Sequence, residues 1–112
     1  MSKINNRGIG NLGEEFAAKL LTLKGYKVLE RNFRFNRGEI DIIAEKDDEL
    51  FFIEIKTRQS EEFGLPAEAV TREKQIRIRN TARYYLLNNH GRYKAYSFQV
   101  IEVMVNQIKN AF

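Results

Sequence analysis

Cysteine is absent from the 112-residue sequence, which excludes a disulfide framework and any metal site built on thiolates. The sequence holds one histidine, His90, so a second histidine for a metal site or for a catalytic pair is missing. Apolar runs stay short of the roughly 18 residues that a membrane-spanning helix needs, and the chain opens with no signal-peptide pattern. We therefore expect no membrane association, and the absence of cysteine fits the cytoplasm.

Proline is also scarce, and the sequence shows no repeat, linker or low-complexity tract. A chain of 112 residues forms one core and has no room for a second, so we expect a single domain over residues 1–112. The net charge of +4 and the pI near 9.4 favour a polyanionic partner. Nucleic acid is the partner class that this charge points to.

A hairpin is predicted between Gly38 and Arg58 (GEIDIIAEKDDELFFIEIKTR). Apolar alternation and β-branched residues favour two strands, at 39–45 and 50–57, around a turn at Asp47-Asp48. Antiparallel partners then have numbers that sum to 95. In that register Asp41 faces Glu54 and Glu39 faces Lys56, with Cβ atoms roughly 4.5–5.5 Å apart.

Two carboxylates side by side among core residues repel each other unless positive charge lies between them. The hard oxygens of Asp41 and Glu54 suit Mg²⁺ or Mn²⁺, and the Ile55 carbonyl, between Glu54 and Lys56, could be a third ligand. Lys56 points the same way as Glu54 and would hold a water or stabilise charge at a phosphate. Glu14 could add a ligand or a second metal position. The alternative is an ordinary ion-pair cluster that has no catalytic role.

The rest of the chain supplies two helices and two more strands, in the order α-β-β-β-α-β, which is a mixed α/β fold. We expect a loose arm at residues 1–10 and a helix capped by Asn11. Its apolar stripe consists of Leu12, Phe16, Leu20 and Leu23, with Ala17 and Leu21. Glu14 and Glu15 would then lie in its first turn. The predicted segments are a helix at 11–24, a strand at 26–35, a helix from 67 or 71 to 87, and a strand at 93–105.

Cations gather beside the predicted acids and along the second helix. Each of them is at home on a solvated surface, but as a group they could hold the phosphates of a nucleic acid. The candidate contacts are Arg31, Arg34, Arg37, Arg58, Arg72, Lys74 and Arg77.

Several segments resemble the YraN family of small bacterial proteins. They include GNLGEEFA at 10–17, GEID at 38–41, FIEIKTR at 52–58, FGLP at 63–66 and IKNAF at 108–112. That family is similar in fold to the PD-(D/E)xK nucleases, particularly archaeal Holliday-junction resolvases. The resemblance implies a restriction-endonuclease-like core in which Glu14, Asp41, Glu54 and Lys56 form the site.

One segment departs from the pattern that the resemblance leads us to expect. An Arg-Phe-Asp run on the last strand is replaced here by Ser97-Phe98-Gln99. The missing acid and base lie outside the stretch from Asp41 to Lys56, so they concern contacts around that strand and leave metal binding unaffected. The role of Glu39, within the GEID segment, stays open.

Two functions follow from these observations. The first is a Mg²⁺- or Mn²⁺-dependent endonuclease acting on DNA, including branched DNA. The second is a non-catalytic nucleic-acid-binding or scaffold protein that retains the nuclease fold. A resolvase would need a twofold dimer to address two strands symmetrically, and the strand at 93–105 could pair across such an axis or lie inside the sheet.

Overall fold

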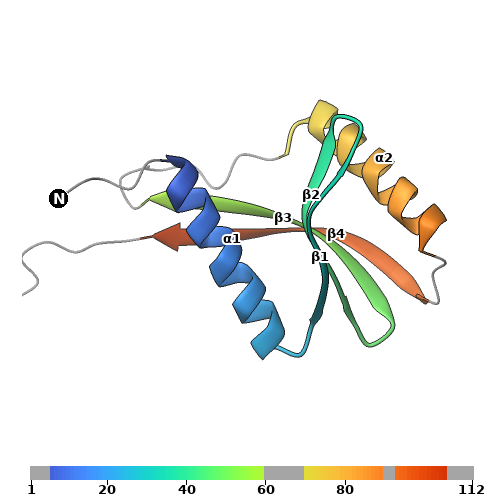
Figure 1. Ribbon diagram of the computed structural model, residues 1–112, viewed down its shortest axis with the longest axis horizontal. Coiled ribbons are helices and arrows are strands. Elements are labelled where there is room, and N and C mark those ends of the chain that lie inside the picture. Colours follow the sequence, from blue (N-terminus) through green and yellow to red (C-terminus); the bar gives the residue numbers. More distant parts are fainter. Residues whose placement is uncertain (1–5, 60–69, 90–92, 106–112) are drawn as a thin grey trace, which may run out of the picture.

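The computed structural model describes residues 6–59, 70–89 and 93–105 of the protein. Two helices flank one four-stranded mixed sheet of order β1-β2-β3-β4 (Figure 1). The antiparallel strands β1, β2 and β3 come first, and β4 then lies parallel to β3 at the edge. The predicted fold class and element order are confirmed. The bounds are α1 Asn6–Leu23, β1 Lys27–Phe35, β2 Gly38–Lys46, β3 Glu49–Gln59, α2 Arg72–Asn88 and β4 Ala95–Val105.

The hairpin of β2 and β3 turns at Asp47 and Asp48, as predicted. Their φ angles are 52° and 64°, the left-handed values that a two-residue hairpin turn needs and that aspartate tolerates. Five residue pairs, from Lys46–Glu49 to Ile42–Ile53, keep the predicted register in which the numbers sum to 95. Because the side chains alternate, Ile42 and Ile53 point towards α1 whereas Ile43 and Phe52 point towards α2.

Helix α1 begins at Asn6, so the predicted cap at Asn11 is wrong and residues 6–10 are helix instead of a loose arm. Glu14 and Glu15 consequently lie in the middle of the helix, and the first turn holds no acid. The predicted C-terminal end is close to the observed one: Leu23 ends the helix, and Gly25 follows with a φ of 91°.

The predicted apolar stripe of α1 is confirmed at Ala17 and Leu21 and is wrong at its other members. Ala17, Ala18 and Leu21 are buried, whereas the larger apolar side chains are exposed: Leu12, Phe16, Leu20 and Leu23. Gly13 explains why small residues are needed, because a Cβ at this position would collide with the Thr57 side chain of β3. The helix backbone therefore lies close to the sheet at the point where β3 leaves β2.

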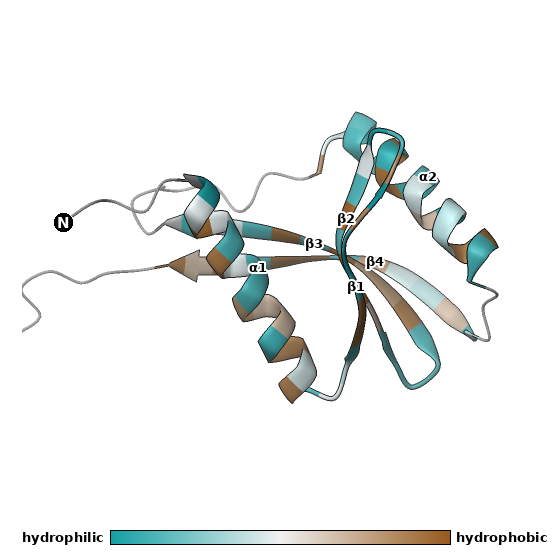
Figure 2. Ribbon diagram, in the orientation of Figure 1, coloured by the Kyte–Doolittle hydropathy of each residue, from teal (hydrophilic) through white to brown (hydrophobic). Residues whose placement is uncertain are grey.

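Helix α2 covers the other face with a mostly polar sequence, as its teal and white colouring in Figure 2 shows. Thr81, Ala82 and Tyr85 are its buried residues. A Cβ at Gly38 would lie 2.6 Å from the Arg77 carbonyl oxygen and would overlap the Thr81 hydroxyl. Glycine at the start of β2 thus allows α2 to approach the sheet backbone.

The sheet forks between β2 and β3. Their pairing ends at Ile42–Ile53, after which the β1–β2 hairpin rises beside the start of α2 while β3 continues with β4 past α1 (Figure 1). The expected pairing of Glu39 with Lys56 is therefore wrong. Glu39 instead lies opposite Arg34 of β1, and Lys56 lies opposite Glu102 of β4.

Strand β4 is an edge of the sheet, which answers the question of whether it is internal. Among the helices of the described residues, none is long and apolar enough to cross a membrane. The residues of the FGLP and IKNAF segments, and His90, lie outside the described residues.

Candidate metal and active site

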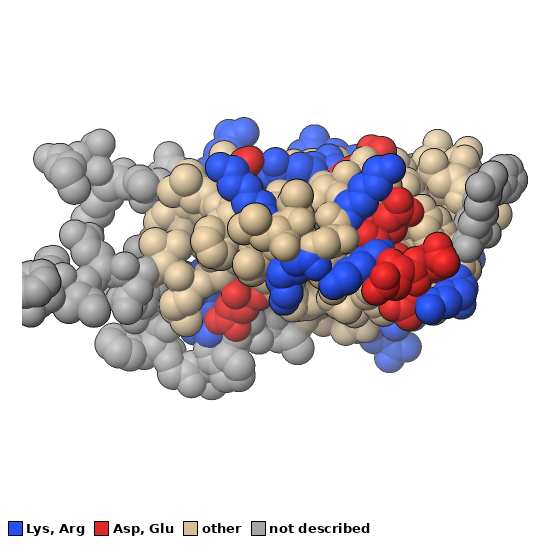
Figure 3. Space-filling model, turned by 90° about the horizontal axis from the view of Figure 1, so that it is seen from below, with Lys and Arg blue, Asp and Glu red and all other residues tan. Residues whose placement is uncertain are grey.

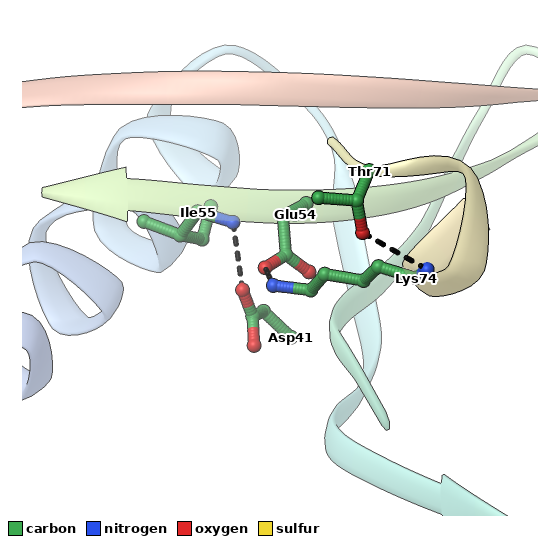
Figure 4. Close-up of polar contacts among 5 residues, drawn as sticks. All are labelled: Asp41, Glu54, Ile55, Thr71 and Lys74. Atoms are coloured by element: carbon green, nitrogen blue, oxygen red, sulfur yellow. Dashed lines mark hydrogen bonds and ion pairs between the residues drawn. The ribbon is translucent and has the colours of Figure 1, made fainter. Parts of the chain in front are cut away.

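Asp41 and Glu54 meet where β2 and β3 separate. Both residues are buried, and each is 9% exposed. The Ile55 backbone N–H donates to Asp41 Oδ2 at 2.7 Å (Figure 4). In a continuing ladder a backbone carbonyl of β2 would accept this N–H, so the Asp41 carboxylate substitutes for the lost strand pairing. The fork is thus what brings a carboxylate of β2 against the backbone of β3.

Lys74 is the positive group that reaches these acids. Its Nζ lies 2.6 Å from Glu54 Oε1, and its backbone N–H donates to the Thr71 hydroxyl at 3.2 Å (Figure 4). Thr71 therefore caps α2 and fixes the first turn from which Lys74 extends. Burial lowers the pKa of Lys74, but the hydrogen bond and negative charge of Glu54 outweigh it and leave this pKa raised.

The site holds more negative than positive charge. Burial raises the pKa of Asp41 to about 7, and Glu54, Glu14 and Glu39 add to the increase, while the hydrogen bond from Ile55 opposes it. The pKa of Glu14 is also raised, first by burial and then by the charges of Glu39 and Glu54. Arg31 lowers the pKa of Glu14 and Lys74 pairs with Glu54, yet the pKa values of Asp41 and Glu14 stay raised, so a divalent cation would find a favourable electrostatic environment here.

Stability in the absence of metal should therefore fall as the pH rises. Between the usual aspartate pKa of 3.8 and about 7, folded Asp41 keeps a proton that the unfolded chain has lost. The folded state then binds more protons, so the free energy of unfolding decreases across this interval. We expect urea denaturation in EDTA to show this decrease, and Asp41→Asn to reduce it. An Asp41→Asn profile identical to wild type would contradict the assignment.

A cavity of about 280 Å³ opens at the two acids. Asp41 and Glu54 line it from the sheet and Lys74 from α2, and the tip of the β1–β2 hairpin contributes Arg37 and Glu39. The pocket therefore joins the carboxylates to cations on two different elements. Such an arrangement suits a phosphate bound beside a metal ion.

The other predicted site residues lie around this pocket. Glu14 is half-buried in the middle of α1, and its charge raises the pKa of Asp41. Lys56 is half-buried on β3, on the face that carries Glu54. The Ile55 N–H faces Asp41, and the carbonyl of a strand residue points to the same side as its N–H, so this carbonyl is available to a metal.

The donor set fits Mg²⁺ or Mn²⁺ held jointly with a phosphate. Within the described residues, three or more acidic, histidine or cysteine side chains do not gather closely enough to hold a metal by themselves. Mg²⁺ commonly uses one or two carboxylates, several waters and substrate phosphate oxygens. Asp41, Glu54 and the Ile55 carbonyl meet that requirement once Lys74 moves away from Glu54.

Five of the seven predicted nucleic-acid contacts form ion pairs with the protein's own acids. Lys74 binds Glu54, and the other four pairs are Arg31 with Glu15, Arg34 with Glu39, Arg58 with Glu102 and Arg77 with Glu73. Arg37 and Arg72 have no ion pair within the described residues. The face in Figure 3 likewise mixes both signs of charge, so that face presents no uniform positive field.

Sequence reasoning missed two features of the site. The sequence predicts that Lys74 contacts nucleic acid. Its pairing with Glu54 joins residues 20 positions apart, and no local sequence pattern indicates such a contact. Thr71 was recognised only as a possible start of the helix. A threonine three residues before Lys74, at the beginning of a helical pattern, is the signal that could have identified it as the cap.

Comparisons with known proteins agree with the resemblance seen in the motifs. The model of "Uncharacterised protein family UPF0102" matches residues 13–103. A UPF0102 protein of Dictyoglomus turgidum is 45% identical over 92% of this chain and 87% of its own length. Similar proteins occur in Syntrophomonas wolfei, at 45% identity over 96% and 99% of the two chains, and in Caldicellulosiruptor saccharolyticus, at 42% over 97% and 100%. These relatives carry a family name and no stated activity.

Proposed function

The chain belongs to the uncharacterised protein family UPF0102, the YraN family, and from this premise we propose that it is a metal-dependent endonuclease that hydrolyses phosphodiester bonds in DNA. One observation carries the proposal: Asp41 and Glu54 are buried together at the fork, Lys74 pairs with Glu54, and burial raises the pKa of Asp41 to about 7. An ion-pair cluster that served only stability would balance its charges, because uncompensated buried charge is costly.

Each residue has a role that its position supports. Asp41 and Glu54, with the Ile55 carbonyl, would hold Mg²⁺ or Mn²⁺, which when bound polarises the phosphate and lowers the pKa of water. Lys56, on the same face of β3 as Glu54, would hold the attacking water or stabilise charge on the phosphate. Glu14 would support the site from α1 through its negative charge.

The cations at the rim would position the DNA backbone. Arg37 lines the cavity from the hairpin tip, and Arg77 lines it from α2. Arg77 pairs with Glu73 at an exposed i,i+4 position, and such pairs are worth little, so Arg77 can exchange this partner for a phosphate. Lys74, once released from Glu54, would be a further phosphate contact.

The second candidate is a non-catalytic protein that binds nucleic acid on the same fold. The observation that favours it is the Lys74–Glu54 pair, which occupies one of the carboxylates that a metal would need. In this case Lys74 would be a permanent counter-ion. DNA binding would then be salt-sensitive and independent of Asp41 and Glu54.

A cleavage panel tests the proposal directly. Single-stranded, duplex, flap and four-way DNA are incubated with the protein in Mg²⁺, in Mn²⁺ or in EDTA. We expect cutting of at least one substrate in the presence of metal and none in EDTA. Calorimetry with Mn²⁺ in the absence of DNA separates the candidates: heat of binding that Asp41→Asn removes supports the enzyme. DNA binding with neither Mn²⁺ binding nor cleavage would establish the scaffold.

A further inference from the structure

A second cavity lies on the other side of Glu54. It measures about 350 Å³ and opens between α2 and strands β3 and β4. Glu54 and Ile78 line both this cavity and the one at the acids, so the two cavities adjoin. The second cavity is mostly apolar, with side chains from four elements that include Ile40, Phe52, Ile78, Phe98 and Val100.

Phe98 gives this cavity an aromatic wall. Its ring stacks on Phe52, with centroids 5.3 Å apart and planes inclined by 27°, yet it remains 39% exposed. The exposed side chain of Arg79 lies over it, with the guanidinium carbon 5.4 Å from the ring centroid. A partly exposed aromatic ring beside a movable arginine is the combination on which nucleobases stack.

The side-chain amide of Gln75 supplies a polar group at the cavity wall. Gln75 Nε2 donates to the Val70 carbonyl oxygen at 2.8 Å, which orients the amide. Its Oε1 has no hydrogen-bond partner within the described part of the chain. Gln99 also lines the cavity, but it lies opposite Ile53 and its side chain points towards α1. An apolar pocket with a few oriented polar groups is typical of sites for small organic ligands, and its volume lies within the usual range.

We propose that this cavity binds one unstacked nucleobase of the DNA strand whose phosphate lies beside Asp41 and Glu54, held by the rim cations Arg37 and Arg77. The inference rests on the proposed function, because the phosphate site fixes where the strand lies. The base would stack on Phe98 in place of Arg79, and its polar edge would face the Gln75 amide. A base enters such a pocket most readily when it is unpaired already, so single-stranded or branched DNA is favoured over intact duplex.

The surface next to Phe98 also combines aromatic and basic side chains. A smaller cavity of about 160 Å³ adjoins it, with Tyr96, Arg79 and Arg83 among its lining residues. The rings of Tyr96 and Phe98 meet edge to face, with centroids 6.2 Å apart. Alternating aromatic and basic side chains follow a single strand well, because every base has a stacking face and every nucleotide has a phosphate.

Binding in EDTA tests the base pocket without any cleavage. A fluorescent thymidine hexamer is compared with a deoxyribose-phosphate hexamer of the same charge that lacks bases, using the full chain and anisotropy. We expect wild type to bind the thymidine hexamer more tightly. Phe98→Ala should weaken that binding roughly 5- to 150-fold, the range of one lost stacking contact, and leave the abasic hexamer unaffected. Phe16→Ala, the same change at an exposed phenylalanine of α1, should alter neither.

Phe98→Leu separates lost stacking from a folding defect in Phe98→Ala, because leucine still packs on Phe52 but has no aromatic ring on which a base can stack. It should show the same selective loss while circular dichroism stays like that of wild type. Equal binding of the two hexamers by wild type, or no binding of either, would overturn the base pocket. Base-selective binding in a protein that cleaves no DNA would overturn the nuclease and leave the pocket standing. Cleavage without base-selective binding would overturn the base pocket and leave the nuclease standing.

Discussion

Replacing Asp41 with asparagine is expected to abolish metal-dependent cleavage, with a loss on the order of 10²–10³-fold or more, as for other groups that act directly on a transition state. Asparagine preserves the size of the side chain and can accept the Ile55 N–H through its own oxygen. It lacks the negative charge that a divalent ion requires. The measurement is the cleavage rate on the best substrate of the panel, together with Mn²⁺ calorimetry.

The stability of this variant separates lost chemistry from lost structure. Because burial raises the pKa of Asp41 to about 7, its charge is unfavourable in the folded protein above that pH. Without metal at pH 8, Asp41→Asn should therefore unfold at a higher temperature than wild type. Mn²⁺ should raise the melting temperature of wild type only.

Asp48→Asn is the matched control for this experiment. It makes the same chemical change at the other end of the same hairpin, at an exposed turn position with a φ of 64°, which asparagine tolerates. Its cleavage and its Mn²⁺ binding should equal those of wild type. Cleavage by Asp41→Asn at the rate of Asp48→Asn would remove Asp41 from the site.

Adding one methyl group at Gly38 is expected to cost about 1–3 kcal/mol of unfolding free energy, the usual scale for overpacking a close contact. The new Cβ would lie 2.6 Å from the Arg77 carbonyl oxygen, which belongs to the backbone of α2 and cannot rotate away. The helix would have to shift as a unit. Because Lys74 and Thr71 are at its start, the shift would also disturb the site. Urea denaturation of Gly38→Ala measures the cost.

Gly10→Ala provides the contrast, since a Cβ at Gly10 would have no heavy atom within 4 Å. It lies in α1, where alanine is more favourable than glycine by about 1 kcal/mol. The two substitutions should therefore change stability in opposite directions. Stabilisation by Gly38→Ala would show that α2 does not depend on this close approach.

The hairpin could be predicted from the sequence because its information is local. The period-two pattern and the Asp47-Asp48 turn fix the register, and five pairs follow it. What the pattern does not contain is the point at which pairing stops. The fork depends on α2 packing against the β1–β2 hairpin, a contact between segments far apart in the chain. The Glu39–Lys56 pairing failed for this reason, while Asp41 and Glu54 still meet.

The prediction that Leu12, Phe16 and Leu20 pack on the sheet was wrong for a related reason. Leu12, Phe16 and Leu20 give the stronger hydrophobic repeat, but burial also depends on how closely two backbones approach. Gly13 brings α1 against β3, and the neighbouring Ala17 has a side chain small enough to fit between them. The ion pair of Arg58 was equally hidden, since Arg58 meets Glu102 only when β4 lies beside β3. Which residues are buried and which ion pairs form depends on contacts between distant segments, and sequence periodicity carries no information about those contacts.

The fork also bears on which ions the protein can accept. Past Ile42–Ile53 no backbone ladder joins β2 to β3 within the described residues, and Asp41 is tied to β3 through its own side chain. The spacing of the two carboxylates is therefore set by rotatable bonds instead of by the fixed separation of paired strands. Mg²⁺ binds oxygen at about 2.0–2.1 Å and Ca²⁺ at about 2.3–2.6 Å, so a rigid pair of ligands would discriminate between them by radius. Carboxylates on the separated strands β2 and β3 would adjust to either radius, and the choice of ion would then depend on which ions surround the protein.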